Sequence, residues 1–455
     1  MKRYVRRCLS LLLAGALFLS GCASAGGNKP QNHYFTMGFS AVSLPVPEDT
    51  EEPLYIAGYR NGYEITGVLD EQQARAVWLS DGKTATVLIA VDCVALGSDT
   101  VGEIRRRLAN FCKKTHTDAG VNVVATHTHA GLDTLGLWGP MGLDGKNGDF
   151  METVIAGAVQ AAKEAYANRC TGTLSYGVTP TLGMQEDSRN PQVYDTNLYQ
   201  VRFTPDDPAN NGIRLIAFAA HAEAMRSRNS LVSRDYPGVM CDYIRERTGE
   251  DVLYVPGAIG GLIMTPVLTD TPLFDAAENS RITGERLGEY ALGEIEWQTL
   301  EPYLRVSRVE FEVQMDNTLF MYYKFLGILQ NPVRRTVDGR YLLSSELTLL
   351  QVGDVTLALL PGEVFPELVF GTETAEDPAG LAEIAASYGV ENLMVIGLAN
   401  DELGYVVSPS DFVLDEELPF VREAEGDHYE ETNSVGSDCA NVLAEAFEKA
   451  LKAWG

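Results

Sequence analysis

Basic residues are scarce in this sequence. The chain has 35 Lys and Arg against 63 Asp and Glu, a formal net charge of −28, and removing the four basic residues of the first 21 positions gives −32. So acidic a chain is repelled by phosphate backbones and by anionic lipid surfaces, which argues against a nucleic-acid partner and against electrostatic adhesion to a membrane. The excess acids are expected to form a solvated surface.

Cysteines are also few. Besides Cys8 and Cys22 near the start, the sequence contains an odd number of cysteines with no CxxC spacing, at Cys93, Cys112, Cys170, Cys241 and Cys439. This pattern disfavours a disulfide framework and a thiolate zinc site, and a single disulfide stays an open alternative.

The sequence has no apolar run long enough to cross a bilayer. Its longest early run, Leu9 to Leu19, is about half of the roughly 20 residues that a membrane helix needs. Basic residues precede the run, and small residues leading to Cys22 follow it, an order typical of a lipoprotein signal peptide. We therefore predict a signal peptide over residues 1–21, lipidation of Cys22, a tether over 22–32, and export to the extracytoplasmic face, where the lipid anchors the chain to the membrane.

The remaining residues, 33–455, alternate strand-like and helix-like patterns. This alternation predicts an α/β fold, which we expect to be one large domain with mixed β-sheets packed with helices. Strands are expected over 74–79, 84–91, 121–125, 197–203, 213–219, 252–255, 304–313, 346–352, 355–360 and 393–398. Helices are expected over 99–114, 236–247, 281–297 and 438–452.

Only six histidines occur in the chain, and two of them form the pair His127 and His129 after the predicted strand 121–125. Residues two apart in an extended segment point to the same side, so both imidazoles can face one cavity. Imidazole is the commonest side-chain ligand of zinc. Taken alone, the pair fits a metal site and satisfied polar residues equally well.

The segment around this pair, Asn122 to Gly131 with the letters NVVATHTHAG, resembles the THTHSG motif of the neutral, non-lysosomal ceramidases. Further landmarks of that family follow in the same order, and the resemblance covers roughly residues 33–455. These landmarks are Ala220-His221 with Ser233 to Gly238, Pro361-Gly362-Glu363, the stretch Asn400 to Tyr405, and Tyr429-Glu430.

The resemblance implies a ceramidase-like catalytic domain that hydrolyses an N-acyl amide, in ceramide-like lipids or other acylated amines, with the help of Zn²⁺. It implies that zinc is held by His127, His221, Glu363 and Tyr405. It also places His129 and Arg189 in contact with the substrate as catalytic residues, and Tyr429 in the substrate site. A ligand set of this kind could hold iron or manganese as well as zinc.

Each ligand position has a plainer structural alternative. His221 follows the small apolar run 217–220 and could be a buried, hydrogen-bonded histidine. Glu363 could favour the N-terminus of a helix beginning near Phe365, where the helix dipole attracts acids. Tyr405 could belong to the core.

The sequence departs from the family where the family's serine nucleophile is expected. The segment Gly260 to Pro266 has no aspartate and no serine, and Thr265 is its nearest hydroxyl. We do not assign the nucleophile to Thr265, and a metal-activated water is the better candidate. Two alternatives follow: a metallo-β-lactamase, disfavoured because Gly131 and Leu132 stand where its motif needs Asp and His, and a surface lipoprotein of the same fold that binds a lipid or glycan without cleaving it.

Overall fold

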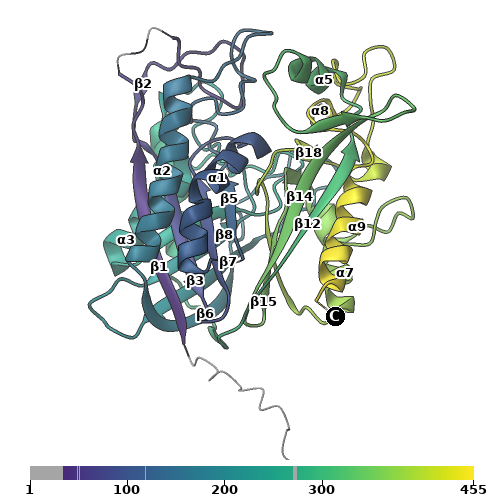
Figure 1. The fold of residues 1–455 in the computed structure, drawn as a ribbon. Coiled ribbons are helices and arrows are strands. Elements are labelled where there is room, and N and C mark those ends of the chain that lie inside the picture. Colours follow the sequence, from purple (N-terminus) through teal and green to yellow (C-terminus); the bar gives the residue numbers. More distant parts are fainter. Residues whose placement is uncertain (1–33, 49, 51, 118, 270–273, 455) are drawn as a thin grey trace, which may run out of the picture. The chain divides into compact units, whose positions relative to one another are not determined.

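The computed structural model describes residues 34–48, 50, 52–117, 119–269 and 274–454. The residues from Tyr34 onward form one compact unit, shown in Figure 1. The predicted signal peptide, the lipidation of Cys22 and the tether lie outside the described residues. Among the helices that are described, none is long and apolar enough to pass through a membrane.

The larger sheet of the described chain has nine strands and combines antiparallel with parallel pairs. Its order is β10-β8-β7-β6-β1-β3-β4-β5, and β11 pairs with β6. The edge pairs β10–β8 and β4–β5 are parallel, and the pairs between them are antiparallel. The strands are β1 (Phe35–Leu44), β3 (Gln72–Ser80), β4 (Ala85–Val91), β5 (Val121–Ala125), β6 (Cys170–Pro180), β7 (Asn197–Pro205), β8 (Ile213–Phe218), β10 (Asp251–Pro256) and β11 (Gln298–Leu300).

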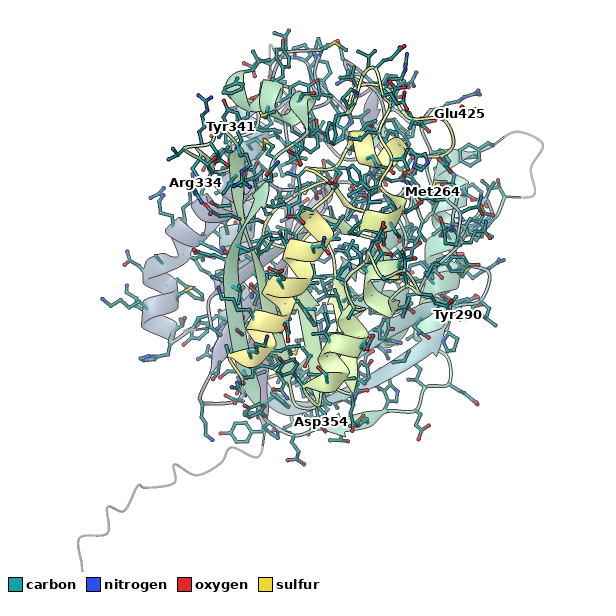
Figure 2. The ribbon with its side chains drawn as sticks, turned by 90° about the vertical axis from the view of Figure 1, so that its right-hand side faces the viewer. Met264, Tyr290, Arg334, Tyr341, Asp354 and Glu425 are labelled. Carbon is teal, nitrogen blue, oxygen red and sulfur yellow. The ribbon has the colours of Figure 1, made fainter. Side chains whose placement is uncertain are left out.

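The smaller sheet has the order β12-β14-β15-β17, with β13 beside β14. Figure 2 views this side of the molecule, with Tyr341 at one end of the long β14 and Asp354 in the turn beyond the other end. Its strands are β12 (Leu304–Gln314), β13 (Val333–Arg335), β14 (Tyr341–Val352), β15 (Val355–Leu359) and β17 (Asn392–Ile396).

The two sheets face each other and are covered by helices on their outer sides (Figure 1). Val77 and Leu88 of the larger sheet share a buried core with Leu357 and Met394 of the smaller one. Both faces of the central strands are buried. Their sequences are therefore continuous apolar runs and do not alternate between apolar and polar residues. The covering helices are α1 (Ser98–Thr115), α2 (Gly148–Ala167), α3 (Asp235–Thr248) and α4 (Ala276–Ala291) on the larger sheet, and α7 (Leu381–Ser387) and α9 (Cys439–Lys452) on the smaller.

Short elements connect the main strands and helices. β16 (Glu363–Val364) and β18 (Tyr405–Val406) form a parallel pair, and β2 (Gly67–Val68) pairs with β9 (Leu231–Val232). The other short elements are α5 (Thr318–Phe325), α6 (Pro366–Phe370), a 3₁₀ turn over Pro409–Asp411, and α8 (Tyr429–Thr432).

Asn400 ties the two sheets together. Its Oδ1 accepts the backbone N–H of Val123 at 3.0 Å, and its own N–H donates to the carbonyl of Val123 at 2.7 Å. Asn400 has φ of 67°, a left-handed conformation that asparagine tolerates better than most residues. The loop after β17 is thereby fastened to β5, the strand that leads to His127.

The predicted α/β class with mixed sheets is confirmed, and so are the expected strands, to within a few residues except at the start of β14. The prediction of a helix over 281–297 is wrong in its limits. The helix begins earlier because Asp275 caps it by accepting the N–H of Glu278, and it ends before Gly293. Helix α2 and strands β1 and β6 were not predicted. The five cysteines of the described chain are all free, so no disulfide forms among them.

Candidate metal centre

His127 follows β5 directly and lies in a left-handed backbone conformation with φ of 64°. Its Nδ1 lies 2.7 Å from the carbonyl oxygen of Val94. A carbonyl can only accept a hydrogen bond, so Nδ1 carries the proton and Nε2 keeps a free lone pair. A histidine fixed in this way is oriented as metal-binding histidines usually are.

His221 follows the end of β8 and has the same arrangement. Its Nδ1 donates to the carbonyl oxygen of Ile263 at 3.0 Å, and its side chain is completely buried. The backbone bridge between Thr128 and Ala222 runs beside the two histidines and fixes their spacing. Nε2 of His221 therefore also presents a lone pair to the space between the two sheets.

Glu363 and Tyr405 come from the opposite side, where they are direct register partners in the β16–β18 pair. Glu363 Oε2 lies 2.9 Å from His221 Nε2 and 3.4 Å from His127 Nε2. Tyr405 Oη lies 3.4 Å from His221 Nε2. Ligand atoms placed about 2.0–2.1 Å from a tetrahedral zinc ion lie about 3.3 Å from one another, which is close to these separations.

The electrostatics of the four groups also fit a cation. Burial would raise the pKa of the Glu363 carboxyl, but His127 and His221 hold it well below its usual range. Burial and Glu363 raise the pKa of Tyr405 well above its ordinary value. Burial lowers the pKa of His221, and the hydrogen bond with Glu363 outweighs this and raises it. With the histidine Nδ1 protons used elsewhere, Nε2 of His127 and Nε2 of His221 both face the Glu363 carboxylate, and a metal ion bound there would replace the proton that these groups otherwise share.

His129 lies beside these ligands. Its Nε2 is 3.1 Å from His127 Nε2. One nitrogen from each of His127, His129 and His221 lies within 4.8 Å of the other two, so the three histidines could hold a metal ion. Burial lowers the pKa of His129 to about 3. His129 is therefore placed either to bind the ion or to contact a group bound to it. We call His127, His129, His221, Glu363 and Tyr405 the metal centre.

Three residues that support His129 were missed by the sequence analysis. Glu223 Oε1 lies 3.6 Å from His129 Nδ1, and Tyr59 donates a hydrogen bond to the other carboxylate oxygen of Glu223. The ring of Tyr59 packs edge-on against His129 at 5.2 Å. Gly58 has φ of +109°, and a Cβ there would come within 2.8 Å of His129 Cβ. The spacing His221-x-Glu223 was the one sequence signal for any of these residues.

A cavity of about 100 Å³ opens beside the metal centre. This is room for a segment of a small molecule, since one water needs roughly 10–15 Å³ by the same measure. His127, His129, Glu363 and Tyr405 line one side, and Tyr429 joins them with its ring 6.2 Å from that of Tyr405. Most of the remaining wall is apolar and includes Leu135, Leu137, Trp138, Met315, Phe320 and Leu343.

Arg189 lies outside this cavity lining, in a separate buried cluster. Its guanidinium donates to Asp411 at 2.9 Å and to Glu430 and Glu431 at 2.8 Å each. It also lies against His428 and over the ring of Phe365. We call Arg189, Asp411, His428, Glu430 and Glu431 the arginine cluster. With its donors engaged there, Arg189 holds the segment that carries Tyr429.

The segment 260–266 supports His221. The carbonyl of Ile263 accepts both the backbone N–H of His221, at 2.7 Å, and its Nδ1–H. Thr265 is completely buried, its hydroxyl has no hydrogen-bond partner, and it is absent from the cavity lining. The segment therefore offers no hydroxyl nucleophile to a substrate in this cavity.

The fold has known counterparts. It is similar to that of neutral ceramidase from Pseudomonas aeruginosa, with a TM-score of 0.71 and 15% sequence identity over 93% of this chain and 74% of that chain. A structure of ceramidase complexed with C2 matches with a TM-score of 0.70 and 15% identity over 93% of this chain and 75% of that chain. The sequence matches no protein-family model and no curated protein. The resemblance expected from the sequence is thus confirmed at the level of the fold, which is neutral ceramidase-like.

Proposed function

We propose that this chain is a zinc-dependent hydrolase that cleaves the amide bond of an N-acylated amine, such as a ceramide-like lipid. One observation carries the proposal. In a buried site on a ceramidase-like fold, the free Nε2 lone pairs of His127 and His221 face the carboxylate of Glu363. Such an arrangement calls for a cation, and two imidazoles with a carboxylate are ligands of catalytic zinc.

Zinc bound by His127, His221, Glu363 and Tyr405 would polarise the amide carbonyl and make water a stronger nucleophile. His129 would accept a proton from the attacking water at Nε2 and return it to the nitrogen of the leaving amine as the C–N bond breaks. Glu223, beside His129 Nδ1, would stabilise the charge that His129 gains. The exchange balances as one water consumed and one acid and one amine released.

Tyr429 would form part of the wall against which the substrate lies, because it is half exposed at the cavity. Arg189 would act through that segment by holding Glu430 and Glu431 in place. We retain direct substrate contact by Arg189 as the alternative that the family resemblance implies.

The N-terminal pattern supports a cellular setting for this reaction. We propose that Cys22 carries a lipid anchor and that the chain acts on the extracytoplasmic face of a membrane, close to lipid substrates. Globomycin, which blocks the lipoprotein signal peptidase, should then cause the uncleaved precursor to accumulate in membranes. Cleavage that is insensitive to the inhibitor would contradict the anchor.

A second function is favoured by the burial of Thr265 and the absence of another hydroxyl from segment 260–266 at the cavity. It is a surface lipoprotein of the same fold that binds a lipid or glycan without cleaving it. Metal content does not separate the two functions, whereas turnover does.

The test of the hydrolase is release of free amine from N-octanoyl amides and from short-chain ceramide by the zinc-loaded protein. We expect turnover that is abolished by a chelator and restored by zinc. We expect His129→Ala to lower kcat by about 10²–10⁴-fold while the metal is retained. Full binding of these amides without any amine release would favour the second function.

A further inference from the structure

Lys324 is a cavity-lining cation that the proposed reaction does not use. It belongs to α5 and lines the same cavity as His127, Glu363 and Tyr405. Its side chain is half-buried, so it is partly shielded by protein and keeps part of its surface accessible. Among the residues that the structure describes, its ammonium forms no hydrogen bond and no ion pair. The three donors of this group are therefore open to a bound molecule.

The other partly buried lysine of the described chain, Lys146, shows that an open ammonium is not the rule in this protein. Lys146 Nζ pairs with Asp144 at 3.4 Å. It also donates to the carbonyl oxygens of Leu135 and Ile328, at 3.2 and 2.9 Å. The remaining described lysines are exposed, and water solvates their charge. Of the described lysines, Lys324 alone is partly shielded and without a partner.

Two carboxyl groups line the same cavity, and neither compensates Lys324. Glu363 faces the histidines of the metal centre. Glu402 accepts the backbone N–H of Gly404 at 2.7 Å. Burial and repulsion from Glu363 raise the pKa of Glu402 well above its usual range, which favours the neutral form of this acid. Because most of the remaining wall is apolar, an anionic group on a bound molecule would compensate the ammonium best.

Helix α5 is held in place beside the cavity. Asn317 is completely buried at its N-terminus and caps the helix by accepting two backbone N–H groups. The Asn317 amide also donates to the carbonyl oxygens of Thr432 and Ser434, at 2.9 and 2.8 Å. Lys324 and Tyr429, which both line the cavity, are therefore carried by segments that are fastened to each other.

We propose that Lys324 is a specificity-determining residue that binds a carboxylate of the substrate. The preferred substrates are then N-acylated amines that carry a carboxylate a few bonds from the amide nitrogen, such as N-acylated amino acids. The spacing is short because one cavity of about 100 Å³ contacts both the metal centre and Lys324. This inference rests on the proposed hydrolase function and narrows its substrate class.

The test uses three octanoyl amides that differ at the end of the amine. They are N-octanoylglycine with a carboxylate, N-octanoylglycinamide with a neutral group of the same shape, and N-octanoyl-ethylenediamine with an ammonium. Binding to the zinc-loaded protein is measured by calorimetry in a His129→Ala background, so that turnover does not interfere. We expect the carboxylate compound to bind at least about 10-fold more tightly than the neutral one, and the ammonium compound to bind most weakly. Because the net charge of −28 repels anions, this preference requires a local cation.

Lys324→Met decides whether that local cation is the lysine or the zinc ion. It keeps an unbranched apolar side chain in α5 and removes the charge, so the affinities of the carboxylate and neutral compounds should come within about 3-fold of each other. Lys324→Arg retains the charge and should retain the preference. Lys163→Met is the matched control, because it removes the same charge from an exposed lysine of α2 and should leave the preference intact.

Equal affinities in the parent protein, a preference for the neutral or the ammonium compound, or no binding of any of the three would overturn the inference. A preference that survives Lys324→Met would overturn it as well, and would leave the lysine only its favourable position in the last turn of α5. Zinc content is measured on each variant. Loss of zinc from Lys324→Met would assign its effect to the metal centre and would also overturn the inference.

Kinetics on the protein with His129 intact then separate this inference from the proposed function. Selective binding of the carboxylate compound without amine release would support the role of Lys324 and overturn the hydrolase. Turnover of all three amides with equal kcat/KM would support the hydrolase and overturn the role of Lys324.

Discussion

The arginine cluster and the metal centre are neighbouring groups of buried charged residues that are stabilised in different ways. Arg189 lies 5.3 Å from the ring of Phe365, and that ring lies 6.4 Å from Tyr405. In the arginine cluster the chain supplies its own cation, and Arg189 donates to every acid it faces. In the metal centre two histidine Nε2 atoms face one carboxylate, and the centre contains no Lys or Arg.

The difference shows which buried polar group points to a ligand. Burial and charge are common to both clusters, so neither property identifies a functional site. What separates them is whether the donors and acceptors within the cluster match. The arginine cluster contains its own cation, whereas the proposed metal centre would be completed by an ion from solution.

The largest effect is expected when a ligand of the metal centre is removed. His221→Ala deletes the nitrogen that faces both Glu363 and Tyr405, so zinc content should fall from about one per chain to near zero. Amide hydrolysis should fall by about 10³-fold or more, because carbonyl polarisation by the ion is lost. Elemental analysis and amine release measure the two effects.

His116→Ala is the control for this substitution. His116 is exposed at the C-terminal end of α1, and its loss should change neither metal content nor turnover. Unchanged zinc binding in His221→Ala would contradict the assigned ligand set.

The second prediction breaks the arginine cluster. Arg189→Ala leaves Glu430 and Glu431, both fully buried, without their cation. The free energy of unfolding should fall by about 3–5 kcal/mol, as measured by urea denaturation, while zinc content stays near one per chain.

Arg106→Ala is the matched control, since Arg106 is 70% exposed and pairs with Glu103 at the surface. It should change the free energy of unfolding by less than about 0.5 kcal/mol. If Arg189 contacts the substrate directly, Arg189→Ala will instead raise KM with little loss of stability.

The smallest expected effect concerns Glu367, which interacts with Asp411 and Arg189 of the arginine cluster. Burial, with added repulsion from Asp187 and Asp411, raises the pKa of Glu367 from 4.5 to about 7. Between these two values the native state holds a proton that the unfolded chain has released. The contribution of this proton to stability is therefore lost as the pH rises from about 4.5 to about 7.

Glu367→Gln should remove that pH dependence and stabilise the protein by about 1–3 kcal/mol at pH 8. Thermal unfolding followed from pH 4.5 to pH 8 gives the comparison. The same substitution at the exposed Glu373 serves as the control and should leave the profile of the parent protein unchanged. A Glu367→Gln profile that runs parallel to the parent's would count against the raised pKa.

The sequence predicts those parts of the molecule that are specified by a pattern of neighbouring residues. β5 was predicted to the residue, because a β-branched run bounded by polar residues specifies a strand without help from the rest of the chain. His127 and His129 were detectable because two histidines two residues apart after a strand are a local pattern. The expected extended backbone is wrong at His127, which has φ of 64°. His221, Glu363 and Tyr405 carry no such pattern, and only the ordered family resemblance brought them together.

The supporting residues were unpredictable for a physical reason. Tyr59 meets Glu223 across 164 positions of sequence, and Gly58 matters only because the ring of His129 needs the space that a side chain would fill. Contacts of this kind are set by the docking of sheets and loops. Arg189 shows the reverse case, since the resemblance placed it at the substrate but its donors are engaged by acids more than 200 positions away.

The register pairing of Glu363 with Tyr405 has a consequence for how the chain matures. The ligands of the metal centre span residues 127 to 405, so a ribosome must release nearly nine-tenths of the 455 residues before the set is complete. A growing chain has no finished site, and tight metal binding therefore has to follow synthesis and the docking of both sheets. For a chain that crosses a membrane before it folds, the metal would come from the supply on the far side, and the availability of zinc in that compartment would limit the yield of active protein.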